Sequence, residues 1–136
     1  MRAVLKHLLF AIGLARLAHR LRNRSVLTVA MLHRVLPPED PRFPGANPTY
    51  TVTRQEFAAC LDFFRRWYSI IDVAAVERAA TGVPLPPCPL LITFDDGWRD
   101  NFEFALPELR ARRLPAVLFV ATDFIGDAHG FWQERV

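Results

Sequence analysis

Apolar runs of strand length alternate along the chain with segments of helical periodicity. The apolar runs occupy residues 25–33, 68–71, 90–94 and 116–121, and the helical segments occupy residues 53–68, 72–82 and 100–113. Strands that alternate with helices pair in parallel in most folds of this kind. The pattern therefore predicts an α/β fold with parallel strands.

Local signals refine these elements. The run at 25–33 offers no polar side chain to solvent except Thr28, so both of its faces are expected to be buried. Residues 36–50 contain five prolines and one glycine, which predicts an irregular loop. Pro107 would break a continuous helix, so residues 100–105 are expected to form a first turn before the helix restarts at Pro107.

Polar residues at the helix ends predict two helix boundaries. Thr53 and Glu56 have the spacing of a capping box, which satisfies free backbone N–H groups at a helix start. Asp72 opens the next helix and Gly82 closes it.

Charge divides the chain into two parts. Of its 136 residues 51% are hydrophobic, enough for the core of one domain, and residues 1–24 carry six basic residues and no acid. The remainder is mildly acidic, which argues against a nucleic-acid-binding domain. Residues 1–24 are predicted to form a basic amphipathic helix, too short to span a membrane. It either packs on the domain or contacts an anionic membrane surface through residues 2–22.

Residues 25–136 are predicted to form the first half of a larger domain. Their strands and helices make up about half of a (β/α) barrel, which typically needs ~250 residues. The chain stops after the last predicted strand without a capping element, so we expect a truncated protein. No evident export signal is present, which favours the cytoplasm or the cytoplasmic face of the membrane.

The stretch Leu90–Asp100, LLITFDDGWRD, runs from a buried strand directly into Asp95 and Asp96. Parallel sheets carry their functional face at the carboxyl ends of the strands. Neighbouring strand side chains point to opposite faces, so both acids share a site only if the chain bends, which Gly97 permits. Two close carboxylates need compensation: either a divalent metal on one acid, with the other as proton acceptor, or capping of the next helix. For Asp100 we expect the capping role.

The segment TFDDG, Thr93–Gly97, resembles the first motif of the polysaccharide deacetylases, the NodB-homology domains of carbohydrate esterase family four. MLHRV (Met31–Val35) and LPAVLFVATDFIG (Leu114–Gly126) are similar to two further segments of this family, in the same order. Together the three matches cover most of residues 26–132.

The resemblance implies a deformed (β/α) barrel and a metal-dependent hydrolase that removes N-acetyl groups from a glycan or glycolipid. In the family a divalent metal, usually zinc, activates water against the acetamide of an N-acetylated carbohydrate. The resemblance assigns Asp95 as the catalytic base and Asp96 as a metal ligand. The family adds two histidines spaced four apart. His7, His19, His33 and His129 do not have that spacing, so the expected zinc site is incomplete in this chain.

The sequence allows two interpretations for each of three residues. His33 contacts the active site or is a strand-end histidine bonded to backbone. Arg99 holds the catalytic aspartate or is solvated. Trp132, next to Phe131, lines the substrate groove or packs in the core.

Two other functions stay open. One is a non-catalytic glycan-binding relative that has lost the metal. The other is a magnesium-dependent phosphohydrolase, although such enzymes use an Asp-x-Asp spacing that DDG lacks. We expect a His-x-x-x-His pair in the reading frame beyond Val136 if the chain is part of a deacetylase.

Overall fold

The computed structural model describes residue 18 and residues 21–125. Most of the predicted basic helix of residues 1–24 lies outside this part, and so does most of the predicted membrane contact. His7, His19, His129 and Trp132 lie outside it as well. Within the described residues no helix is both long enough and apolar enough to cross a membrane.

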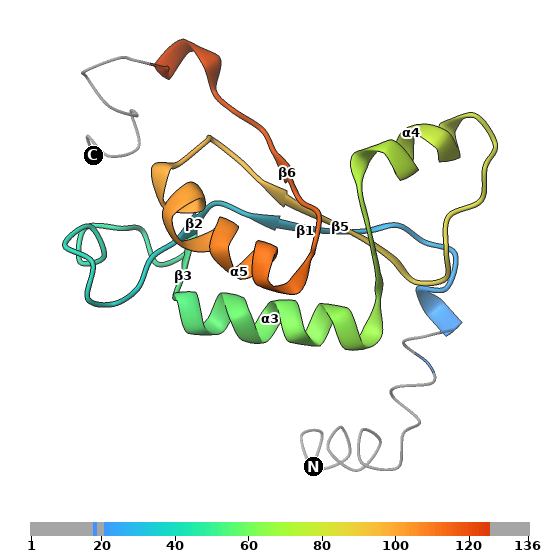
Figure 1. Ribbon diagram of the computed structural model, residues 1–136, viewed down its shortest axis with the longest axis horizontal. Helices are drawn as coiled ribbons and strands as arrows, with labels where there is room; N and C mark the ends of the chain where they lie inside the picture. The colour runs from blue at the N-terminus through green and yellow to red at the C-terminus, as the bar shows by residue number, and fades with distance from the viewer. Residues whose placement is uncertain (1–17, 19–20, 126–136) are drawn as a thin grey trace.

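A parallel sheet centred on β5 (Pro89–Phe94) forms the middle of the fold (Figure 1). One edge of β5 pairs with β1 (Thr28–Leu32) through residues 90–94. The other edge pairs first with β4 (Ser69–Ile71) and then with β6 (Val117–Leu118). The predicted α/β fold with parallel strands is therefore confirmed, and the closed barrel stays a prediction.

A second, two-stranded parallel sheet joins β2 (Arg34–Val35) to β3 (Thr51–Val52). Residues 36–50, which connect them, contain turns and no helix or strand, as their prolines predict. The pairing continues past β2, because the backbone N–H of Leu36 donates to Val52 O at 3.0 Å.

Two of the helices begin where their capping residues predict. In α3 (Arg54–Trp67) the Thr53 side chain accepts from the Glu56 N–H, and Glu56 accepts from the Thr53 N–H, so the capping box is confirmed. α4 (Val73–Ala80) is capped by Asp72, and Gly82 follows its end with a φ of +99°.

The segment around Pro107 is divided into a first turn and a helix, as predicted, but the two are continuous. Residues Asn101–Ala105 form a π-helical turn, η1, and α5 (Leu106–Arg112) follows with Pro107 in its first turn. The backbone stays helical through Ala105 and Leu106, and the Leu106 N–H donates to Asn101 O. Pro107 therefore follows a change of helix type and not a gap between two helices. A short 3₁₀ turn, η2 (Thr122–Phe124), ends the described chain.

The core lies between the sheet and the helices α3 and α5, which are on the same side of the sheet in Figure 1. Leu90, Ile92 and Phe94 of β5 pack there with Phe57 and Leu61 of α3. The whole of β5 is buried, as its apolar sequence predicts.

The prediction that both faces of β1 are buried is wrong. Ala30 and Leu32 pack against the core, whereas Val29 is 52% and Met31 62% exposed. Side chains alternate between the two faces of a strand, and within the described residues the helices α3 and α5 cover only one of them.

Candidate active site

The chain bends sharply where β5 ends. The Asp95 N–H still donates to Leu32 O at 3.0 Å, which extends the pairing with β1 by one residue. Asp96 and Gly97 then both have a left-handed backbone, with φ of +73° and +80°. The predicted bend after the acidic pair is confirmed, and it begins at Asp96 itself.

Gly97 is required here for two reasons. A residue with a side chain is strained at its positive φ. A Cβ at Gly97 would also lie 3.0 Å from Val120 Cγ1, because the segment after β6 passes close to the turn. The Ala121 N–H donates to Asp96 O at 3.4 Å and so ties this segment to the acidic pair.

The Asp96 carboxylate contacts an indole. Trp98 Nε1 donates to Asp96 Oδ2 at 3.1 Å. Arg34 lies over the face of the same indole, with its Cζ 4.2 Å from the ring centroid. A guanidinium at this distance over an indole makes a favourable cation–π contact.

Asp100 anchors Arg34 in the interior. Arg34 Nε donates to Asp100 Oδ2 at 2.9 Å, and the Val35 N–H donates to Asp100 Oδ1 at 3.1 Å. Both side chains of the pair are buried. Burial raises the pKa of Asp100, and the hydrogen bonds from Val35 and Arg34 oppose that rise.

The predicted capping role of Asp100 is wrong. Its side chain makes no capping hydrogen bond to η1. The carboxylate instead turns inward to β2, where a buried guanidinium needs a counter-charge.

His33 and Arg99 each contact a residue outside the acidic pair. His33 directly follows Leu32 at the carboxyl end of β1, and its ring centroid lies 5.0 Å from that of Tyr50. The Arg99 side chain is 84% exposed and donates to Glu103 Oε1 at 2.6 Å, which corresponds to the solvated reading. Trp132 lies outside the described residues.

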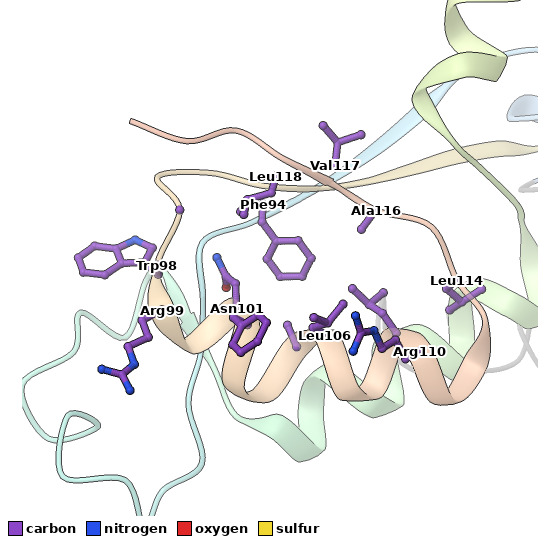
Figure 2. Close-up of a pocket in the computed structure, with 14 residues that line it drawn as sticks. Phe94, Trp98, Arg99, Asn101, Leu106, Arg110, Leu114, Ala116, Val117 and Leu118 are labelled. Carbon is purple, nitrogen blue, oxygen red and sulfur yellow. The ribbon is translucent and has the colours of Figure 1, made fainter. Parts of the chain in front are cut away.

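A cavity of about 310 Å³ adjoins the turn, between β6 and the helical segments η1 and α5 (Figure 2). Phe94, Gly97 and Trp98 line it, but Asp95 and Asp96 do not. Asn101 also lines it; the residue is 6% exposed, and its Oδ1 and Nδ2 atoms have no hydrogen-bond partner among the described residues. This cavity is therefore not the predicted shared pocket of the two acids.

The described residues do not fit a complete zinc site. A catalytic zinc takes three protein ligands. Asp95 and Asp96 supply carboxylate oxygens, but no group of three histidine, cysteine, aspartate or glutamate side chains converges within residues 21–125. The site as described therefore contributes part of a ligand set at most.

The sequence reasoning missed Arg34 and misread Asp100. Arg34 stands between the apolar segments Ala30–Leu32 and Val35–Leu36, a position that indicates burial. A buried arginine requires an acidic partner, so the sequence did contain a signal for a buried ion pair. That signal does not identify the partner, which lies 66 residues away.

These features define the chain as a parallel α/β protein. Its central strand ends in the acidic turn Asp95–Gly97, at the carboxyl edge of the sheet, where such folds bind ligands. No family model matches the chain. Over 47 residues it is 38% identical to YxkH of Bacillus subtilis (strain 168), which is named as a polysaccharide deacetylase; the match covers 35% of this chain and 17% of YxkH.

Solved structures from Ammonifex degensii and Streptococcus pyogenes are among those similar to the described fold. IcaB from Ammonifex degensii is 33% identical with a TM-score of 0.59, over 69% of this chain and 37% of IcaB. The Streptococcus pyogenes deacetylase PplD, solved in complex with acetate, has a TM-score of 0.62 at 24% identity, over 75% of this chain and 46% of PplD; this likeness shows the fold alone. The chain spans less than half the length of each relative. The sequence likeness to YxkH, together with the fold shared with these solved structures, confirms the resemblance to polysaccharide deacetylases that the motifs predict.

Proposed function

We propose that the chain forms part of a hydrolase that removes N-acetyl groups from a polysaccharide or glycolipid. The observation that carries the proposal is the Asp95–Gly97 turn at the carboxyl end of the central strand, within the motif that resembles those enzymes. The relatives that are named as deacetylases support the same reaction.

We assign Asp95 as the general base and Asp96 as a ligand of a divalent metal, zinc by resemblance. Hydrolysis of an acetamide breaks the bond between the carbonyl carbon and nitrogen and yields acetate and a free amine. A carboxylate such as Asp95 would accept the proton of the attacking water. The remaining metal ligands would have to come from outside the described residues. His33, at the end of the neighbouring strand, and Trp132 are proposed substrate contacts.

Acetate release tests the proposal. The protein is produced from its natural reading frame and incubated with N-acetylglucosamine oligomers. Acetate and free amine are then measured together. We expect equal amounts of both, and a loss of at least ~100-fold in Asp95→Asn, because the base is removed.

Glu77→Gln is the matched control, since Glu77 is an exposed carboxylate on α4 and should leave the rate unchanged. Binding of the oligomers without acetate release would reject the hydrolase and favour a glycan-binding protein. Phosphate release from phosphate esters in place of acetate release would favour a phosphohydrolase.

A further inference from the structure

A continuous set of contacts joins β2 to the acidic turn. It runs from Asp100 to Arg34, from Arg34 to the Trp98 ring, and from the Trp98 N–H to Asp96 Oδ2. We infer that Trp98 is a positioning residue for Asp96, with its indole N–H fixing the orientation of the carboxylate. This inference deepens the proposed function, because it concerns how an active-site carboxylate is held.

The backbone alone does not orient the carboxylate. The left-handed backbone of Asp96 and its carbonyl contact with Ala121 fix where the side chain starts. Rotation about the two side-chain bonds still allows several directions. An indole has a single N–H, so Trp98 holds Oδ2 and leaves the other oxygen for a different ligand.

The indole is in turn held from behind. Arg34 belongs to β2 and is buried, and Asp100 binds both its Nε and the N–H of Val35. The guanidinium therefore has a fixed position, and the indole lies against it at 4.2 Å. The direction of the Trp98 N–H is thus set by β2, which belongs to the two-stranded sheet and does not pair with β5.

The alternative is that Trp98 only packs under Arg34 and its N–H is incidental. Trp98→Phe separates the two roles, because phenylalanine keeps a ring for the guanidinium but has no N–H. Trp67→Phe is the matched control. Trp67 ends α3 next to β4, at the opposite end of β5 from Asp96.

The indole ¹⁵N–¹H resonance of Trp98 tests the contact without any need for activity. The resonance is assigned by its loss in Trp98→Phe. Asp96→Gly removes the acceptor and tolerates the positive φ, so we expect the Trp98 resonance to move upfield while that of Trp67 does not. Asp95→Ala should leave the Trp98 resonance in place. An unchanged Trp98 resonance in Asp96→Gly, or an equal shift in Asp95→Ala, would overturn the inference.

Kinetics test the consequence of the contact. In the native product we expect Trp98→Phe to lower kcat by ~10–100-fold with KM changed by less than ~2-fold, because a misdirected group slows the reaction more than it weakens binding. Trp67→Phe should change neither constant. An unchanged kcat in Trp98→Phe would reject the positioning role. If the unmodified protein releases no acetate, the proposed function fails, while the resonance experiment still decides whether Trp98 holds Asp96.

Discussion

Residues of the acidic turn fit its left-handed backbone conformation and also carry its chemical groups. Asp96 carries the carboxylate in a left-handed conformation, which aspartate and asparagine tolerate better than most residues. Gly97 continues the same conformation against Val120. The sequence predicts this bend because glycine after an apolar strand is a local signal.

Gly97→Ala should lower the free energy of unfolding by ~1–3 kcal/mol, because it combines a strained φ with the close contact to Val120. Urea unfolding followed by circular dichroism measures the change. Gly45→Ala is the control: a Cβ at Gly45 would meet nothing within 4 Å, and Gly45 has no positive φ, so the midpoint should stay in place. Equal loss in both variants would contradict the argument.

Asp100→Asn should be among the most damaging single changes. It leaves Arg34 buried without a counter-charge, and breaking a buried pair costs ~3–5 kcal/mol of stability. Asp62→Asn breaks the exposed pair with Arg112 and should cost less than ~1 kcal/mol. Urea midpoints of the two variants give the comparison, and similar values for both would show that the buried pair has no special role.

The sequence could not predict the role of Asp100 for a physical reason. Asp100 and Glu103 have the spacing of a helix cap, and capping depends only on neighbours in the chain. The carboxylate binds Arg34 and Val35 instead, because the start of η1 is buried and a buried charge there requires an opposite charge.

At the scale of elements, boundaries followed local chemistry. The capping box at Thr53 and the Asp72 cap depend on residues within one turn, and both are confirmed. Before Pro107 the helix changes type without a break. Burial of β1 depends on which helices cover which face of the sheet. Its sequence does not contain that information, and the prediction for Val29 and Met31 was wrong.

Thr53→Ala should weaken the start of α3. The alanine cannot accept from the Glu56 N–H, so we expect a loss of ~1 kcal/mol in stability. Thermal unfolding measures it, with Gln55→Ala in the exposed first turn as the control, where little change is expected. A loss in Gln55→Ala as large as that in Thr53→Ala would contradict a capping origin.

At the scale of the whole molecule, arginine pairs set the response to acid. Arg42 lowers the pKa of Asp40 to about 2, and Arg42 and Arg99 also lower the pKa of Glu103. Arginines lower the pKa of Asp62 and Glu108 in the same way. Only the pKa of Asp100, which burial raises, changes in the opposite direction among the described carboxyls whose pKa shifts.

A lowered carboxyl pKa stabilises the fold above the unfolded value of about 4, and this stability is lost as the pH falls toward the folded value. We therefore expect the urea midpoint to decrease between about pH 4 and pH 2. Arg42→Gln should reduce this decrease, because Asp40 then loses its arginine partner while Glu103 keeps Arg99. A midpoint that stays constant or rises over this interval would contradict the stabilising role of these arginine pairs.

The parallel architecture and the position of the acidic turn followed from the sequence, because apolar periodicity and strand order determine them. The proposed metal site did not follow in full, since no three candidate ligand side chains converge among the described residues.

The complete burial of β5 has a consequence for handling the protein. Leu90–Phe94 is an uncharged segment of high strand propensity, and every one of its residues is shielded in the fold. Once heat or denaturant releases it, the same segment can pair with its counterpart in another molecule and seed insoluble cross-β aggregates. After unfolding, refolding and precipitation are therefore expected to compete. Dilution should increase the fraction of protein that refolds, because aggregation requires two molecules to meet.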